Sequence, residues 1–130
     1  KIIKEANNFN TIVFYNKTGI KKIKLLKKLK IKIFKISLDK NGHLDLIRSL
    51  KKAKQLGFSR IFLESGIELA TSFLKENLVD DFKLFISNKN LAKNGSSNIK
   101  KSFRFFFKNK KKTIEKVNLL GDKLISYKLK

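Results

Sequence analysis

Strand-like and helix-like segments alternate along the first two-thirds of the chain, and this order restricts the fold more than any other feature. Residues 11–15 are β-branched and aromatic and predict a strand, and the apolar residues within 31–36 predict a second strand. Between them, residues 20–29 carry apolar side chains at helical spacing, with lysines at most other positions. Two strands separated by a helix are typical of parallel strands joined by a crossover connection.

The alternation continues after a turn predicted at residues 39–42. Residues 44–56 have apolar side chains three and four positions apart and predict a second helix, with Gly57 where a C-terminal cap belongs. The apolar run at residues 59–63 then predicts a buried parallel strand. Glu64-Ser65-Gly66 ends this run.

The last third of the chain is rich in strand patterns. A third helix is predicted at residues 67–77 and a polar loop at 88–97. Strands are predicted on both sides of that loop, at residues 82–86, 102–107, 114–120 and 124–129. The whole order predicts an α/β fold of three layers, in which helices flank a mostly parallel sheet with antiparallel C-terminal strands.

The charge of the chain favours an anionic partner. The formal net charge is +22, and only three of the 32 basic residues are arginines. A basic nucleic-acid-binding module is therefore an alternative function. Nucleic-acid readers use arginine more than lysine, however, and the abundance of Lys, Asn, Ile and Phe is also what an AT-rich genome produces. We prefer the genomic explanation, although a positive field also suits a phosphate-bearing cofactor and substrate.

Other features of the composition exclude several classes of protein. The chain has no cysteine, which excludes disulfides and thiolate metal sites. No apolar run approaches the roughly 18–20 residues needed to span a bilayer. We therefore expect no membrane segment and a cytoplasmic location.

The turn at Glu64-Ser65-Gly66 is the strongest candidate site. A strand that ends in small residues and leads into a helix leaves backbone N–H groups unpaired at the helix start. Together with the helix dipole, these groups can bind phosphate, and Gly66 lets a diphosphate approach the backbone. The alternative is a tight strand-to-helix turn that binds no ligand.

A longer window supports the first interpretation. Residues 61–74 read Ile-Phe-Leu-Glu-Ser-Gly-Ile-Glu-Leu-Ala-Thr-Ser-Phe-Leu, and residues 78–81 read Leu-Val-Asp-Asp. This combination resembles the reductase domain of bacterial riboflavin-biosynthesis deaminase–reductases, a family with a dihydrofolate-reductase-like fold. The resemblance is strongest across residues 42–86. Ser65 departs from the family pattern, which has a glycine there, and residues 87–92 depart from the Ala-Pro-Lys-Leu-Leu-Gly that usually follows.

The resemblance implies an NADPH-dependent reduction of 5-amino-6-(5-phosphoribosylamino)uracil to its ribitylamino product. It implies that Glu64 faces the substrate and that Tyr15, or its neighbour Asn16, lies near the cofactor. The residues expected to surround the cofactor phosphates are Gly66, Ile67, Glu68, Leu69, Ala70, Thr71 and Ser72. It assigns no catalytic residue and no metal.

The resemblance also implies a domain organisation. Residues 1–130 are expected to be the C-terminal part of a single reductase domain whose N-terminal half is missing, with a deaminase domain further upstream. We expect the isolated segment to have little activity, because much of the substrate pocket would lie in the missing half. A homodimer is a possible assembly.

Three other groups of residues invite a functional role. His43 is the only histidine, but its place at a predicted helix start is ordinary for a surface residue. No carboxylate partner is evident for it beyond Asp45. Asp80 and Asp81 are adjacent at a strand start and are expected to point to opposite faces, which argues against a shared metal ion.

The third group interleaves phenylalanines with cations between residues 103 and 112. Such a pattern can stack single-stranded nucleic acid. We prefer a strand with one buried face followed by a lysine-rich turn.

Overall fold

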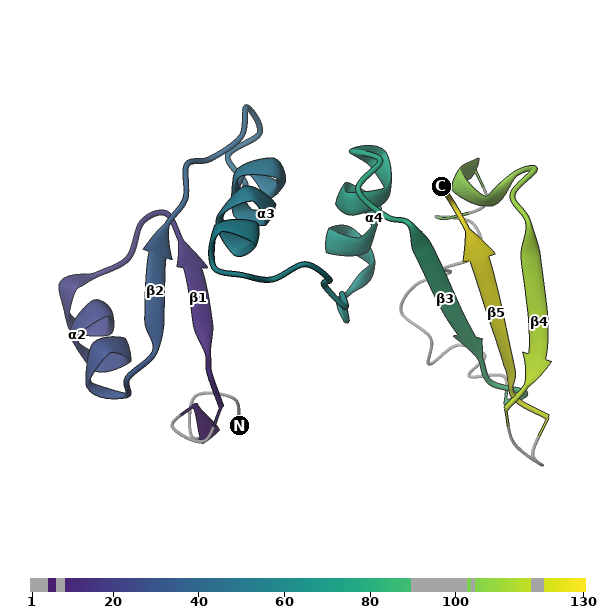
Figure 1. Cartoon of the computed structure of the whole chain (residues 1–130), viewed down its shortest axis with the longest axis horizontal. Coiled ribbons are helices and arrows are strands. Elements are labelled where there is room, and N and C mark those ends of the chain that lie inside the picture. The colour runs from purple at the N-terminus through teal and green to yellow at the C-terminus, as the bar shows by residue number, and fades with distance from the viewer. Residues whose placement is uncertain (1–4, 7–8, 90–102, 104, 118–120) are drawn as a thin grey trace. The chain divides into compact units, whose positions relative to one another are not determined.

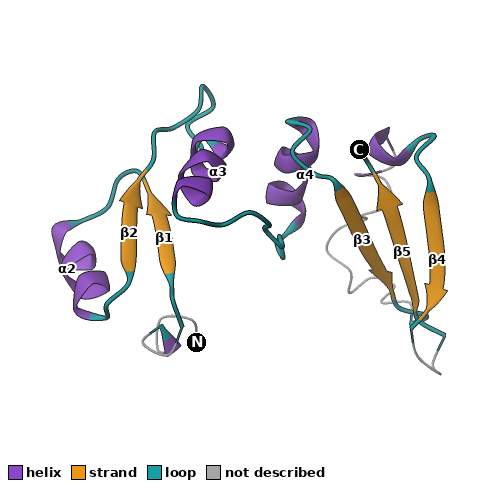
Figure 2. Ribbon diagram, in the orientation of Figure 1, coloured by secondary structure: helices purple, strands orange, loops and turns teal. Residues whose placement is uncertain are grey.

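A computed structural model describes residues 5–6, 9–89, 103, 105–117 and 121–130 (Figures 1 and 2). The chain divides into two compact units, Lys1–Ile61 and Phe62–Lys130, and each is described by itself.

The first unit begins with a parallel strand–helix–strand motif, as the sequence predicts. Strand β1 (Ile12–Tyr15) and strand β2 (Lys32–Lys35) pair in parallel, and helix α2 (Ile20–Lys28) connects them. The buried side chains of α2 and of the residue before β2 form a core with Ala6; its members are Ala6, Leu26 and Ile31, with Val13, Leu29 and Ile33 packed against them. The crossover through α2 thus packs one face of the helix against the two paired strands.

Helix α3 (Leu46–Gln55) follows a turn that side chains hold in place. The Asp39 carboxylate accepts hydrogen bonds from the backbone N–H groups of Asn41 (2.8 Å) and His43 (2.9 Å). Gly42 has a φ of 81°, a left-handed conformation that favours glycine. The predicted turn is therefore confirmed.

The glycine predicted to end α3 is confirmed as well. Gly57 has a φ of 95°, which stops the helix from continuing. Lys52 of α3 places its ammonium 4.7 Å from the centre of the Phe34 ring on β2, so the helix contacts the strand through a cation–π pair.

The strand predicted at residues 59–63 is wrong. These residues form an irregular connection, and no ladder pairs them with any described strand. Ile61, Phe62 and Leu63 are exposed, with Phe62 86% accessible. The boundary between the two units falls inside this run. An apolar run becomes a strand only when another strand satisfies its backbone groups, and within the described residues none does so.

The described part of the second unit combines helix α4 and a helical turn at Phe105–Phe107 with an antiparallel sheet of three strands in the order β3-β5-β4. Its elements are α4 (Ile67–Lys75), β3 (Asp81–Ile86), β4 (Lys112–Lys116) and β5 (Lys123–Lys128). The strands predicted near residues 82–86 and 124–129 are confirmed, and so is the described part of the one predicted at 114–120. Residues 118–120 lie outside the described part, as does most of the predicted loop at 88–97.

The strand predicted at residues 102–107 is also wrong. Phe103 and Phe105–Phe107 are helical. Phe103 and Phe107 are four positions apart, so they lie on the same side of this turn. Phe103 packs edge-on against Phe82 at 5.4 Å, and Phe107 stacks on Tyr127 at 4.2 Å. A helical turn thus places two aromatic rings on the β3–β5 face, where an alternating strand was expected.

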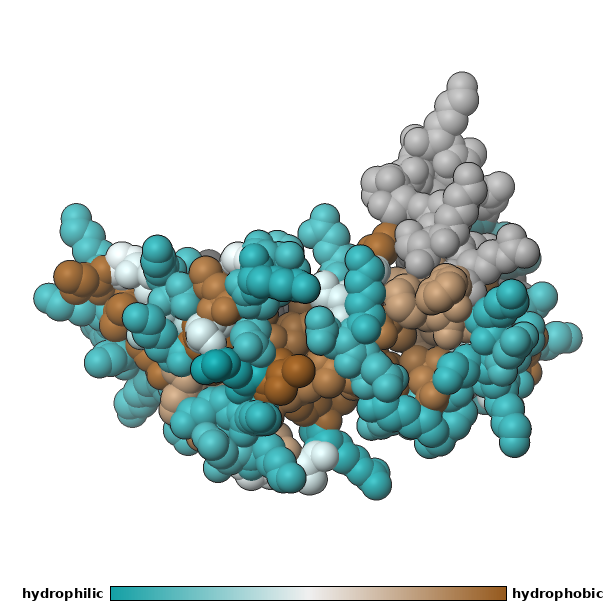
Figure 3. Space-filling model, turned by 90° about the horizontal axis from the view of Figure 1, so that it is seen from above, coloured by the Kyte–Doolittle hydropathy of each residue, from teal (hydrophilic) through white to brown (hydrophobic). Residues whose placement is uncertain are grey.

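The mixed α/β class is therefore confirmed, whereas a single mostly parallel sheet is not seen. The described strands form a two-stranded parallel sheet and a separate three-stranded antiparallel sheet. Hydrophilic and apolar side chains interleave over the visible surface of each unit (Figure 3). No helix in the described ranges is long and apolar enough to cross a membrane.

Candidate functional site

The start of α4 has the geometry of an open anion site. Gly66 is the N-cap, with extended backbone (φ −68°, ψ 170°) and no side-chain capping bond. Its carbonyl accepts the first helical hydrogen bond, from the N–H of Ala70 at 3.1 Å. The N–H groups of Ile67, Glu68 and Leu69 precede that bond and have no carbonyl within the helix. Beyond its chain neighbours, no atom lies within 4 Å of the position that a Cβ at Gly66 would occupy. A phosphate can therefore approach these donors.

Hydroxyl groups near this helix start are already engaged with backbone carbonyls. Thr71 Oγ1 donates to the carbonyl of Ile67 at 2.7 Å, and Ser72 Oγ donates to that of Glu68 at 3.0 Å. Ser65 Oγ lies 3.3 Å from the carbonyl of Gly66. The donors that face an anion are thus the backbone N–H groups of the first turn, and Thr71 and Ser72 belong to the second turn.

One charge in the first turn works against an anion. Glu68 is exposed there and is the acidic residue that complements the positive end of the helix dipole. Its carboxylate stabilises the helix start and repels a phosphate placed beside it. A bound diphosphate therefore has to displace this side chain toward solvent or attract a lysine as counter-charge.

Glu64 lies in the exposed connection before α4. No described cation forms an ion pair with it. Because the strand predicted before it is absent, the alternation of a β-strand does not orient its side chain.

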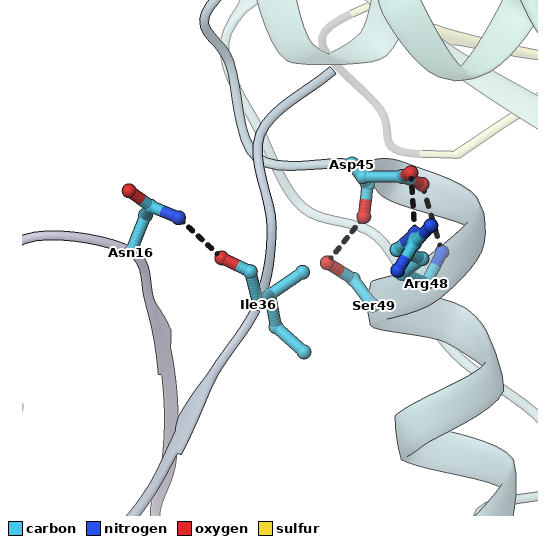
Figure 4. A network of polar contacts seen from close by, with 5 residues as sticks. All are labelled: Asn16, Ile36, Asp45, Arg48 and Ser49. Carbon is cyan, nitrogen blue, oxygen red and sulfur yellow. Dashed lines mark hydrogen bonds and ion pairs between the residues drawn. The ribbon is translucent and has the colours of Figure 1, made fainter.

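Tyr15 lies at the carboxyl end of β1, in the first unit. Its carbonyl accepts a hydrogen bond from the N–H of Ile36 at 2.7 Å. The side-chain amide of Asn16 donates to the carbonyl of Ile36 at 2.8 Å (Figure 4). These bonds hold the ends of β1 and β2 together. The structure thus places Tyr15 at a strand end, as expected, but in a different unit from Glu64 and the α4 segment.

A polar network that the sequence analysis did not identify lies at the start of α3 (Figure 4). Asp45 is the N-cap: its carboxylate accepts the N–H of Arg48 at 2.9 Å and pairs with the Arg48 Nε at 3.2 Å. Ser49 Oγ donates to the carbonyl of Asp45 at 2.8 Å. An aspartate directly before an apolar helical pattern is a capping signal that could have located this helix start.

The hydrogen bonds around His43 give the residue a structural place in the turn before α3. The His43 N–H donates to Asp39, while Asp45 is committed to α3, so the carboxylate next to His43 in sequence is a helix cap. The hydrogen bond from the His43 N–H lowers the pKa of Asp39 below its usual value, aided by the N–H of Asn41.

The two adjacent aspartates at the start of β3 each form an ion pair with a different lysine. Asp81 pairs with Lys128 at 3.3 Å, and Asp80 pairs with Lys130 at 3.4 Å. The Asp80 carbonyl also accepts the N–H of Leu129 at 2.8 Å. These contacts tie the end of the chain to β3. Across the ranges that the structure describes, no three His, Asp or Glu side chains gather as metal ligands would.

A second glycine resembles Gly66 closely. Gly19, the N-cap of α2, has φ −68° and ψ 147°, no side-chain cap, and no atom within 4 Å of a Cβ position. The first turn of α2 carries lysines and no acidic residue. No role is predicted for Gly19 from the sequence, and its geometry makes it the natural control for Gly66.

Comparison with known families decides which kind of protein this is. Residues 3–117 match the family model described as the RibD C-terminal domain. The chain belongs to this family. RibD C-terminal domains are reductase domains of riboflavin biosynthesis, so the chain is an oxidoreductase domain of a family that generally uses a pyridine nucleotide. The resemblance drawn from residues 61–81 is thereby confirmed. Among curated proteins, no significant match was found.

Proposed function

We propose that this RibD C-terminal domain uses NADPH to reduce 5-amino-6-(5-phosphoribosylamino)uracil to its ribitylamino product. Membership of the family supports a reductase. The observation that carries the cofactor proposal is the open start of α4 at Gly66, where three backbone N–H groups precede the first helical bond. A dinucleotide presents a diphosphate, the anion that such a helix start binds.

In this proposal the chain binds and orients the two reactants. NADPH supplies the hydride that reduces the phosphoribosyl group. The N–H groups of the first α4 turn bind the diphosphate, and the segment from Gly66 to Ser72 surrounds it. Glu64 faces the substrate. Because cofactor and substrate both carry phosphate, the net charge of +22 favours the approach of each to the protein.

We also propose that the complete domain has a dihydrofolate-reductase-like, three-layer fold. Membership of the family supports this fold. The described residues supply a parallel strand–helix–strand unit and a set of antiparallel strands, which are the kinds of element that such a fold combines. An experimental structure of a longer chain with one central sheet and helices on both of its faces is the expected observation, and a structure with separate sheets would contradict the proposal.

The remaining proposals concern the whole protein. The resemblance supports a deaminase domain upstream, a cytoplasmic location and assembly as a homodimer. It also leads us to expect little turnover from residues 1–130 alone. For this reason binding of NADPH, rather than turnover, is the primary measurement on this chain.

The test compares Gly66→Val with Gly19→Val. Both glycines cap a helix with extended backbone and open space, so valine fits either backbone and has a similar effect on folding. At Gly66 the new side chain occupies the phosphate approach. We expect NADPH affinity, measured by nucleotide fluorescence, to fall at least about tenfold in Gly66→Val and to stay unchanged in Gly19→Val.

Circular dichroism of both variants verifies that the fold is retained. Equal NADPH affinity in the two variants and the parent chain would contradict the α4 site. A loss confined to Gly19→Val would instead move the phosphate site to the start of α2. Repeating the titration with NADH tests the choice of nucleotide, and we expect weaker binding than with NADPH.

A further inference from the structure

The helical turn before β4 leaves one phenylalanine outside the core. Phe103 is 3% exposed and Phe107 stacks on Tyr127, whereas Phe105 is 85% exposed. Phe105 contacts Phe106 edge-on, with ring centres 5.9 Å apart. The sequence pattern favours a strand with one buried face here, and the structure contradicts that prediction. Phe105 therefore needs an explanation other than the core, with the half-buried Phe106 beside it.

Lysines follow this aromatic pair directly. Lys108, Lys110, Lys111 and Lys112 are exposed, and no acidic residue occurs between Phe105 and Ile114. Lys110 Nζ donates to the carbonyl of Leu129 at 2.8 Å. In the described part of the chain, no carboxylate pairs with any of these four lysines. Their mutual repulsion is therefore relieved only by solvent ions or by an anionic partner.

We propose that this surface binds single-stranded nucleic acid without sequence preference. We call it the Phe–Lys turn and define it by Phe105, Phe106, Lys108, Lys111 and Lys112. An exposed ring beside unpaired cations fits a ligand that has both a flat aromatic face and phosphates. Unpaired nucleotides meet both conditions, since a base stacks on the ring while the backbone phosphates contact the ammonium groups.

Two other anionic partners fit less well. The bases of a duplex are already stacked on one another and do not reach a phenyl ring. A membrane-surface segment needs an amphipathic helix with a broad apolar face, whereas here a single turn presents one highly exposed ring. The proposal is independent of the reductase activity, because it involves none of the residues assigned to NADPH or substrate.

The first test removes the ring. Fluorescence anisotropy of a labelled 20-nucleotide oligothymidine measures binding by the full chain. We expect Phe105→Ala to weaken binding about tenfold and Phe105→Tyr, which keeps the ring, to restore it. The matched control is Phe85→Ala: Phe85 is also exposed, at 69%, but lies on β3, which β5 separates from the strand that follows the lysine run. We expect this control to bind as the parent chain does.

The second test removes the charge. The double variant Lys108→Gln, Lys111→Gln is compared with Lys27→Gln, Lys28→Gln on α2, which loses the same charge in the other unit. For single strands, each lost phosphate contact lowers the slope of log affinity against log salt by about 0.7. We therefore expect the slope to fall by about 1.4, which is 2 × 0.7, in the turn variant, and by much less in the α2 variant.

Several outcomes would overturn the proposal. Unchanged binding by Phe105→Ala, or an equal loss in Phe85→Ala, would show that the ring does not stack on a base. Equal slopes in the two lysine variants would show that binding is spread over the whole basic surface. Tighter binding to a duplex of the same length, or to anionic lipid vesicles, would assign the surface to another partner. A change in oligomeric state in Phe105→Ala, without a change in oligonucleotide affinity, would make it a contact between copies of this chain.

Discussion

Helices α2 and α4 both begin at a glycine that follows an apolar run, but the two apolar runs have different structures. Each follows an apolar run and has an extended N-cap glycine without a side-chain cap. The run before Gly19 forms β1, whereas the run before Gly66 forms no strand. The difference lies in the partner. β1 pairs in parallel with β2, which returns after a single helix, while residues 59–63 have no described strand beside them.

A buried strand therefore has two requirements, suitable side chains and a neighbouring strand, and only the first can be seen in a local sequence pattern. Hydrophobic, β-branched residues provide the side chains of a buried strand, but hydrogen bonds from a neighbour are needed to hold its backbone. The helix starts themselves depend only on local features. For this reason both begin where the sequence places them, whatever precedes them.

The largest expected effect tests whether the β1–β2 region is buried while residues 59–63 are exposed. Ile31, which leads into β2, is 4% exposed, so Ile31→Ala should cost about 2–5 kcal/mol of unfolding free energy. Phe62 is 86% exposed, so Phe62→Ala should change it by less than about 0.5 kcal/mol. Urea unfolding of the 130-residue chain measures both. A cost of several kcal/mol for Phe62→Ala would mean that the second run is buried as a strand after all.

A smaller effect concerns how the helices begin. α3 has a carboxylate cap, so Asp45→Ala should cost about 1 kcal/mol, with Asp45→Asn retaining most of the stability. α4 has a glycine cap, so Gly66→Ser should gain a few tenths of a kcal/mol while weakening NADPH binding, since the hydroxyl would compete for the first-turn N–H groups. Thermal unfolding followed by circular dichroism, with NADPH titration in parallel, measures both effects. A gain in both stability and affinity would contradict the proposed use of this helix start.

The smallest effect belongs to the turn after β2, where the Asp39 carboxylate accepts backbone hydrogen bonds, whereas the starts of α2 and α4 have no side-chain cap. Backbone donors lower the pKa of Asp39 in the folded state. Its ionised form therefore stabilises the turn above the unfolded pKa of about 3.9, and this stabilisation is lost as the pH falls through the lower folded pKa. An NMR titration of the Asp39 carboxyl carbon should give a midpoint below that of Asp39 in a short peptide. Equal midpoints would show that the hydrogen bonds from Asn41 and His43 are not maintained in solution.

Local signals in the sequence predicted much of this structure correctly. Helical spacing located all three named helices, and β-branched runs located β1 and β2 because their partner lies within one crossover. Gly57 and the turn at Asp39 were predicted from conformational preference, which acts within a few residues.

The errors arise where contacts between distant segments decide the outcome. Residues 59–63 needed a neighbouring strand that their own composition cannot supply. The phenylalanines from 103 to 107 form a helical turn because the β3–β5 face, formed by Phe82 and Tyr127, accepts rings four positions apart. The start of α4 was predicted correctly, whereas its role as a phosphate site, inferred from the turn before a helix and supported by the resemblance, remains a prediction.

The exposed connection between the two units also bears on the solubility of the chain. Ile61, Phe62 and Leu63 form a short uncharged run of the kind that pairs with identical segments of other molecules and starts aggregation. Arg60 precedes the run and Glu64 follows it, so each copy places opposite charges at the two ends. In-register stacking of two copies brings like charges together, and such flanking charges act as gatekeepers. Glu64 would thus protect the chain during folding as well as face the substrate.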